Sequence, residues 1–210
     1  MTNGTMLVPT RWSLFLHSNA NMSSQIIKFL RNEATDFNGR SLLELIEQTD
    51  HQMERTHHSI QWMFPTDIPS EHSDYAPVLT QEDIAEMKTD KVVQSSIKKC
   101  LTRMIDFYDK DDYWISQRNH NFKRITRILR CLWLAGLVHE YVCFQRALDE
   151  IYNTSNNLCI IGAETYLYWK NANNDSFLRD EDRERKVIEY LKKMDDDEKL
   201  DNMPDWFGCI

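Results

Sequence analysis

Apolar residues recur at the spacing of an α-helix along two long segments of the chain, residues 81–109 and 120–137. In the second segment, positions i, i+3, i+4 and i+7 are occupied by Ile125, Ile128, Leu129 and Leu132. The first segment begins after Thr80, which forms a capping-box pattern with Asp83. Both stripes must be buried against each other or against further helices, so we predict a pair of long helices at the centre of the fold.

Shorter amphipathic segments predict more helices on either side of this pair. Ser23 or Ser24 can cap the first of them, and Ser41 forms another capping-box pattern with Glu44. Thr89 and Asp90 can split the first long segment into two helices. The other predicted helices span residues 23–33, 41–49, 50–63, 138–152, 159–171 and 181–194.

The composition supports a helical fold. Glycine and proline occur five times each among 210 residues, which argues against sandwiches and barrels with many turns. Hydrophobic residues make up 41% of the chain, enough to build a core without a metal or a disulfide. We therefore predict an all-α fold, a compact multi-helix bundle in a single domain. Its expected parts are a flexible leader (1–22), a helical domain (23–194) and an acidic tail (195–210).

Charge is distributed unevenly along the chain. The net charge of -8 argues against nonspecific nucleic-acid binding by the whole protein. Residues 118–130 nevertheless carry five Lys and Arg residues and no carboxylate. This basic helix face could bind phosphate or nucleic acid, lie in solvent, or pair with the acidic residues of segment 179–205. Arg124 lies at the edge of the apolar stripe, where burial requires an acidic partner.

The cysteine pattern, the N-terminal residues and the length of the apolar runs predict a soluble protein inside the cell, in the cytoplasm or the nucleus. The five cysteines are odd in number and widely spaced, which favours reduced thiols over a disulfide framework. The N-terminal residues lack the pattern of a secretory signal. The longest apolar run, residues 131–138, is too short for a transmembrane helix.

No motif of catalytic or metal-binding chemistry is present. The sequence contains no His-Glu-x-x-His, no Gly-x-Ser-x-Gly and no glycine-rich phosphate loop. We therefore predict no metal, no cofactor and no catalytic residue. One alternative stays open, an enzyme whose site assembles from His57, His58 and His120 with carboxylates distant in the sequence.

Two blocks of the sequence stand out by their residue order. The first is residues 58–65, His-Ser-Ile-Gln-Trp-Met-Phe-Pro, and the second is residues 119–132, Asn-His-Asn-Phe-Lys-Arg-Ile-Thr-Arg-Ile-Leu-Arg-Cys-Leu. Both are similar to signatures of the opioid growth factor receptor conserved region. Between them, residues 97–108 resemble a helix of that family which ends in a Phe-Tyr pair. The blocks occur in family order, and the resemblance spans about residues 41–152.

This resemblance implies a short, single-domain helical member of a family whose animal members are receptors for an enkephalin-type opioid peptide. Those receptors are soluble proteins associated with the nucleus, so receptor activity and a role in signalling are implied. We expect a noncatalytic binding or regulatory protein with a peptide or protein partner.

The convergence of the two blocks places a peptide site in a cleft between residues 62–65 and the helix start at residues 120–127. The candidate ligand-binding residues are His58, Gln61, Trp62, Phe64, Asn119, His120, Arg124 and Arg127. A structural interpretation of the same residues stays open. Trp62 and Phe64 can fill the core beside the proline turn, and the two arginines can hold the proline loop (residues 65–77) through charge-assisted hydrogen bonds.

Overall fold

The structure is a computed structural model. It describes residues 24–179 except His57, Glu71, His72, Asp74 and Ser155. It also describes Arg185, Val187, Ile188, Glu189 and Lys192. Within these residues the regular elements are helices, accompanied by one isolated β-bridge between Thr66 and Val78. The predicted all-α fold class is therefore confirmed.

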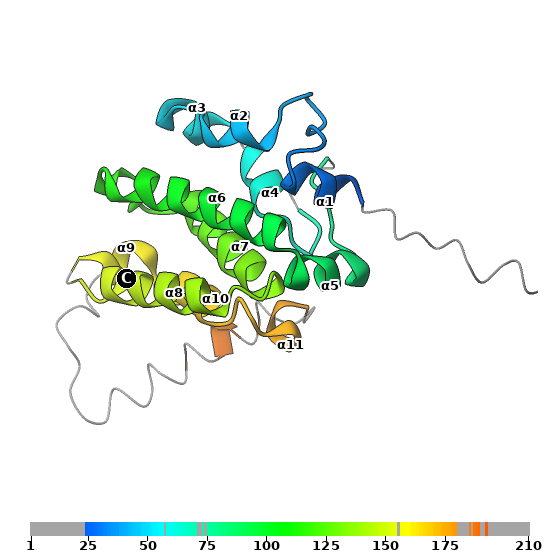
Figure 1. The fold of residues 1–210 in the computed structure, drawn as a ribbon. Helices are drawn as coiled ribbons and strands as arrows, with labels where there is room; N and C mark the ends of the chain where they lie inside the picture. Colours follow the sequence, from blue (N-terminus) through cyan, green and yellow to red (C-terminus); the bar gives the residue numbers. More distant parts are fainter. Residues whose placement is uncertain are drawn as a thin grey trace, which may run out of the picture.

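The helices form three layers (Figure 1). The first layer contains α1 (Gln25–Leu30), α2 (Leu42–Ile46), α3 (Asp50–Arg55) and α4 (Ser59–Met63). The middle layer contains α5 (Gln81–Thr89), α6 (Lys91–Asp109), the short η1 (Asp112–Trp114) and α7 (Asn121–Leu134). The third layer contains α8 (Val138–Tyr152), α9 (Asn157–Ile161), α10 (Ala163–Lys170) and α11 (Asp175–Leu178).

Most helix ends follow from local signals. The capping boxes at Ser41 and Thr80 both form, with Glu44 and Asp83 as the partners at the third helical position. Asp90 splits the first long segment, because its Oδ1 accepts hydrogen bonds from Val92 N at 2.7 Å and from Val93 N at 3.1 Å. These boundaries agree with the sequence-based expectation.

Other boundaries differ from the expectation. The first helix ends at Leu30 rather than near residue 33, because Asn32 adopts a left-handed conformation with φ of 63°. The segment 50–63 divides into α3 and α4, with Thr56 extended between them. Gly162, at φ of 78°, separates α9 from α10 where one helix was predicted. Helix α11 was not predicted.

The predicted leader and acidic tail lie outside the described residues, as does most of the helix predicted at residues 181–194. The described residues of that last segment are helical. No helix in the described part of the chain is long and apolar enough to cross a lipid bilayer.

We expect Asp90→Ala to lower the free energy of unfolding by about 1–2 kcal/mol, because α6 loses its N-cap. Asp90 Oδ2 also accepts a hydrogen bond from Arg31 Nε at 2.7 Å, so the substitution removes an ion pair as well as the N-cap. Urea unfolding followed by circular dichroism measures the loss. Asp90→Asn keeps a capping oxygen and should lose less. Equal losses in the two variants would assign the effect to the Arg31 ion pair instead of the cap.

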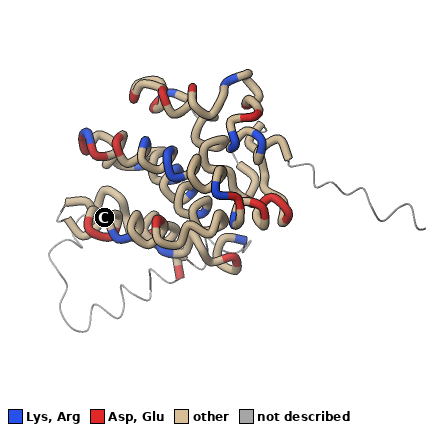
Figure 2. Tube along the Cα trace, in the orientation of Figure 1, with Lys and Arg blue, Asp and Glu red and all other residues tan. Residues whose placement is uncertain are grey.

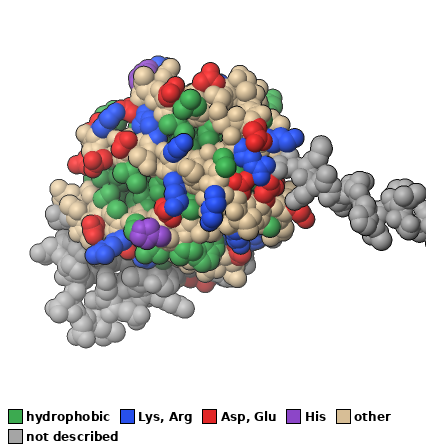
Figure 3. Space-filling model, in the orientation of Figure 1, with side chains coloured by type: hydrophobic (Ala, Val, Ile, Leu, Met, Phe, Trp, Pro, Cys, Tyr) green, Lys and Arg blue, Asp and Glu red, His purple; other side chains and the backbone are tan. Residues whose placement is uncertain are grey.

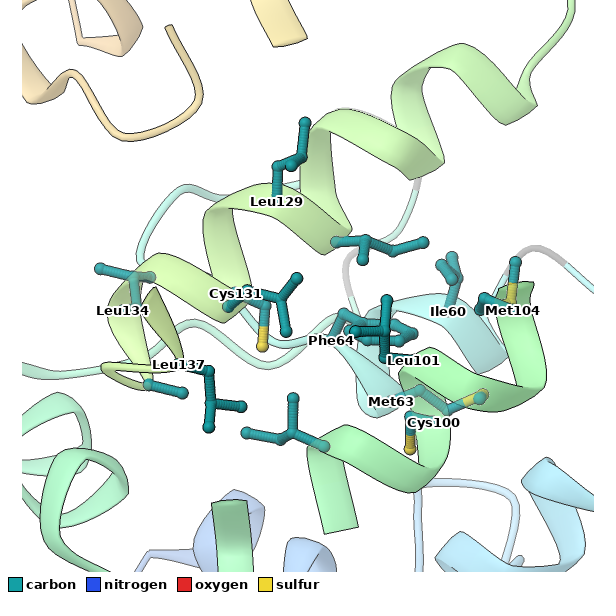
Figure 4. Packing of buried hydrophobic residues seen from close by; sticks show 14 of the residues in the cluster. Ile60, Met63, Phe64, Cys100, Leu101, Met104, Leu129, Cys131, Leu134 and Leu137 are labelled. Atoms are coloured by element: carbon teal, nitrogen blue, oxygen red, sulfur yellow. The ribbon is translucent and has the colours of Figure 1, made fainter. Parts of the chain in front are cut away.

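The core is centred on α7. The apolar stripe Ile125, Ile128, Leu129 and Leu132 is fully buried, as its spacing predicted. Figure 4 shows Ile60, Met63 and Phe64 between the α7 ribbon and the α6 residues Cys100, Leu101 and Met104. The end of the first sequence block is therefore a plug between the two long helices.

The surface carries mixed charge. Figure 2 shows basic positions along the middle layer, and two of them on α7, Arg124 and Arg130, are buried. On the face drawn in Figure 3, charged side chains are interspersed with smaller apolar areas. The basic helix face of residues 118–130 is thus partly enclosed rather than solvated along its length. Part of it lines a pocket.

Candidate ligand-binding pocket

A pocket of about 880 Å³ lies where three distant parts of the chain meet. One wall comes from α4 and the proline loop, the second from the first turns of α7, and the third from α10 and α11. Its apolar lining consists of Ile60, Ile68, Pro69, Phe122, Tyr168 and Leu178. This is the place where the two sequence blocks were expected to converge.

The predicted site residues divide into two groups. His58, Gln61, His120, Arg124 and Arg127 line the pocket. The other three have structural contacts elsewhere. Trp62 packs edge-on against Phe29 in the core, and Phe64 is completely buried. Asn119 Oδ1 accepts a hydrogen bond from Asn121 N at 2.9 Å at the start of α7.

Arg124 joins α7 to the end of α3. Its guanidinium donates to Met53 O at 3.0 Å, to Glu54 O at 3.3 Å and to Asn121 Oδ1 at 3.1 Å. The residue is only 5% exposed, and burial lowers its pKa while the nearby Glu54 charge opposes this change. The Glu54 carboxylate, 3.6 Å away, is the acidic partner that burial of this residue required.

Arg127 has no such partner. Its Nε donates to Phe64 O at 2.8 Å, which ties the proline turn to α7. Burial lowers the pKa of the guanidinium to about 10, so it stays charged at neutral pH. Among the described residues no carboxylate lies within 4.0 Å of it, and its buried Nη2 has no hydrogen-bond partner.

Gln61 presents a second unsatisfied atom at the pocket. The residue is 5% exposed, and its Nε2 donates to Ser70 Oγ at 2.8 Å. Its Oε1 is buried and accepts no hydrogen bond from any described residue. Leaving a buried polar atom unpaired costs about 1–3 kcal/mol, so native proteins normally satisfy such atoms with protein, water or ligand.

A cluster of ion pairs is centred on Arg130, which lines the pocket. Arg130 Nε and Nη2 bind the carboxylate of Asp67 in the proline loop at 3.0 and 2.7 Å. The same guanidinium contacts Asp175 of α11, and Arg179 also reaches Asp67. We call these residues the Asp67 cluster. It joins the proline loop, α7 and α11, three segments that no local sequence signal connects.

The Asp67 cluster changes the interpretation of the basic helix face. From the sequence, the basic helix face that contains Arg130 was expected to bind phosphate or nucleic acid, to lie in solvent or to pair with segment 179–205. In the structure Arg130 is only 3% exposed, and its partners are Asp67 and Asp175, both outside that segment. The proline loop and α11 cover this side of α7, and this burial could not be seen from the periodicity of one helix.

The Asp67 cluster predicts a dependence of stability on pH. Burial opposes ionisation of Asp67, but the hydrogen bonds and charge of Arg130, with the charge of Arg179, outweigh it and lower the pKa of this carboxyl below its ordinary value of 3.8. A carboxyl whose pKa is lower in the folded chain stabilises the fold above its unfolded pKa. That contribution is lost as the pH falls through the folded pKa.

We therefore expect the difference in free energy of unfolding between the wild-type protein and Asp67→Asn to be full at pH 6. It should shrink progressively below about pH 4. Urea unfolding at a series of pH values measures this difference. A difference that stays constant from pH 6 to pH 3 would show that ionisation of Asp67 contributes nothing.

Two histidines of the sequence-based enzyme alternative meet at this pocket. His58 Nδ1 lies 3.1 Å from Ser73 Oγ, and His120 Nε2 lies 3.3 Å from Glu54 Oε1. The third, His57, lies outside the described residues. In the part of the chain that the structure describes, no group of three or more His, Cys, Asp or Glu side chains is arranged to hold a metal ion.

The fold and the pocket together define a helical protein with a basic, partly apolar pocket at the junction of its three layers. Residues 19–112 match the family model of the opioid growth factor receptor (OGFr) conserved region. This part of the chain is therefore similar to the OGFr conserved region. No curated protein and no solved structure was found to match the chain.

The family match confirms the resemblance that the first sequence block carries. The matched residues extend from before α1 into η1, so they include α4 and the proline loop. The second block, at α7, lies beyond the matched range. The pocket thus joins the matched residues to the remainder of the chain.

Proposed function

We propose that this protein is a noncatalytic peptide-binding protein and that the pocket between α4, the proline loop and α7 holds the peptide. The observation that carries the proposal is that two residues lining one pocket each have a buried polar atom without a hydrogen-bond partner among the described residues, Gln61 Oε1 and Arg127 Nη2. A peptide group has one carbonyl acceptor and one N–H donor. It can therefore accept from Arg127 and donate to Gln61.

The size and the lining of the pocket suit a short segment of peptide. Small-ligand pockets typically measure about 300–1,000 Å³ and combine an apolar lining with a few polar groups, and this pocket of about 880 Å³ falls within that range. Side chains of the peptide would contact Ile68, Tyr168 and Leu178. The family description, opioid growth factor receptor, is consistent with a peptide ligand and a regulatory role.

The alternative of a phosphate or nucleic-acid interface on residues 118–130 has less support. A nucleic-acid surface needs accessible cations that can reach phosphates. Arg124 and Arg130 are buried, and each already has a carboxylate partner.

The proposal is tested by affinity selection from a random pentapeptide mixture, with bound peptides identified by mass spectrometry. A suitable blocking variant is Thr126→Trp, because Thr126 lines the pocket and a Trp side chain would fill it. The wild-type protein should enrich a set of peptides that this variant does not.

The matched control is Thr102→Trp on α6. Its hydroxyl also donates to the carbonyl four residues earlier, as that of Thr126 does, but Thr102 is exposed and does not line the pocket. This variant should enrich the same peptides as the wild type. No enrichment by the wild type, or equal enrichment by Thr126→Trp, would overturn the proposal.

A further inference from the structure

We propose that the pocket takes the C-terminal end of a peptide, with the free carboxylate bound by Arg127 at the first turn of α7. This inference rests on the proposed peptide-binding function and specifies which part of the peptide binds. Local charge, the orientation of α7 and the chemistry of Gln61 support this assignment.

The charged side chains Lys123, Arg124, Arg127, Arg130 and Glu164 line the pocket. Arg124 has Glu54 nearby, and Arg130 is paired with Asp67 and Asp175. Arg127 has no carboxylate partner among the described residues, and its Nη2 is buried. The partly buried Arg127 already donates from Nε to Phe64 O, but its Nη2 is unsatisfied, so an anionic group of a ligand would complete its hydrogen bonding.

The first turn of α7 favours the same kind of group. Phe122 and Lys123 of this turn line the pocket, and the N–H groups of Asn121 and Phe122 already donate to Asn119, so the turn acts on a ligand through its dipole. The helix spans fourteen residues, Asn121–Leu134, so its aligned peptide dipoles place partial positive charge at this end. An anion at the pocket is stabilised both by this charge and by Arg127.

Gln61 distinguishes a peptide C-terminus from a simple anion. Its unpaired Oε1 requires a donor, whereas inorganic phosphate and a side-chain carboxylate offer mainly acceptors at neutral pH. The last residue of a peptide carries its carboxylate and its backbone N–H on the same Cα. It can therefore satisfy Arg127 and Gln61 together, while its side chain contacts the apolar lining. An apolar last residue fits this lining best.

The inference is tested with two pentapeptide mixtures of the same sequences, one with a free C-terminal carboxylate and one with a carboxamide. We expect the wild-type protein to bind the free acids roughly tenfold to a hundredfold more tightly, as is typical when one charged hydrogen-bond partner is removed. The enriched acids should end in apolar residues. Individual pairs are then compared by calorimetry.

Arg127→Gln should bind acid and amide equally, whereas Arg146→Gln should keep the preference. Arg146 is a matched control because it removes the same charge from an exposed position of α8 that does not line the pocket. The comparison of acid and amide on the wild-type protein needs no variant, so a folding defect of Arg127→Gln leaves the test intact.

The possible outcomes separate the two proposals. Equal binding of acids and amides, lost in Thr126→Trp, would overturn the C-terminal assignment and retain peptide binding in the pocket. Binding of neither mixture would overturn both. Displacement of the acids by inorganic phosphate at comparable concentration would show a general anion site and would also overturn the assignment.

Discussion

Arg130→Met is expected to lower the free energy of unfolding by about 3 kcal/mol, because removing one member of a buried ion pair leaves the other charge uncompensated. Arg130 is only 3% exposed and binds both carboxylate oxygens of Asp67. Arg179 still reaches Asp67 in the variant, so the loss should lie at the lower end of the range for such pairs. Methionine retains most of the apolar stem of the side chain, which isolates the effect of charge.

The double variant Arg130→Met, Asp67→Leu provides the decisive comparison. Replacing both members of a buried ion pair by apolar residues is often neutral or stabilising, so this variant should be more stable than Arg130→Met alone. Arg146→Met is the control for an exposed ion pair, with an expected change of at most about 1 kcal/mol. The single variants Arg130→Met and Asp67→Leu complete the comparison. If their losses in free energy of unfolding simply add in the double variant, Arg130 and Asp67 do not stabilise the fold as a pair.

The Asp67 cluster also illustrates what could not be predicted from the sequence. Arg130 and Asp67 are separated by 63 residues, and neither occurs in a local pattern that refers to the other. Periodicity assigns a residue to a face of its helix, but it does not state what covers that face. Two features could not be predicted for this reason. One is the burial of the basic side of α7, and the other is the wall of the pocket that α10 and α11 form.

Features that depend on neighbouring residues were predicted correctly. The stripe of Ile125 and Leu129 is buried, and the capping residues Ser41, Thr80 and Asp90 begin the helices expected from them. Such features require only the geometry of a single helix. Helix α11 was not predicted because it spans only Asp175–Leu178, which is too short to show an apolar period.

The candidate pocket was predicted in part. The two sequence blocks indicated where segments 62–65 and 120–127 would meet, and five of the proposed residues line the pocket there. The residues contributed by α10 and α11, Tyr168 and Leu178 among them, belong to neither block. Which member of a signature faces a cavity and which faces the core depends on tertiary packing. Trp62 and Phe64 demonstrate this, because both belong to the first block and both are buried.

Phe64→Ala is expected to lower the free energy of unfolding by about 3–5 kcal/mol, because Phe64 is completely buried between α6 and α7 and its removal leaves a cavity. Urea unfolding measures the loss. Tyr113→Ala is the control, since Tyr113 is 83% exposed and its removal should change stability by less than about 0.5 kcal/mol. Phe64→Leu keeps much of the apolar volume and should lose clearly less than Phe64→Ala.

The same variants separate the structural and ligand-contact interpretations of the first sequence block. The backbone oxygen of Phe64 accepts from Arg127, and this hydrogen bond does not require the phenyl ring. Phe64→Leu should therefore retain the position of Arg127 and the affinity for peptides enriched by the wild-type protein, while its stability falls. A variant that remains as stable as the wild type but no longer binds those peptides would instead make the ring a ligand contact, and the plug between α6 and α7 would not be its main role.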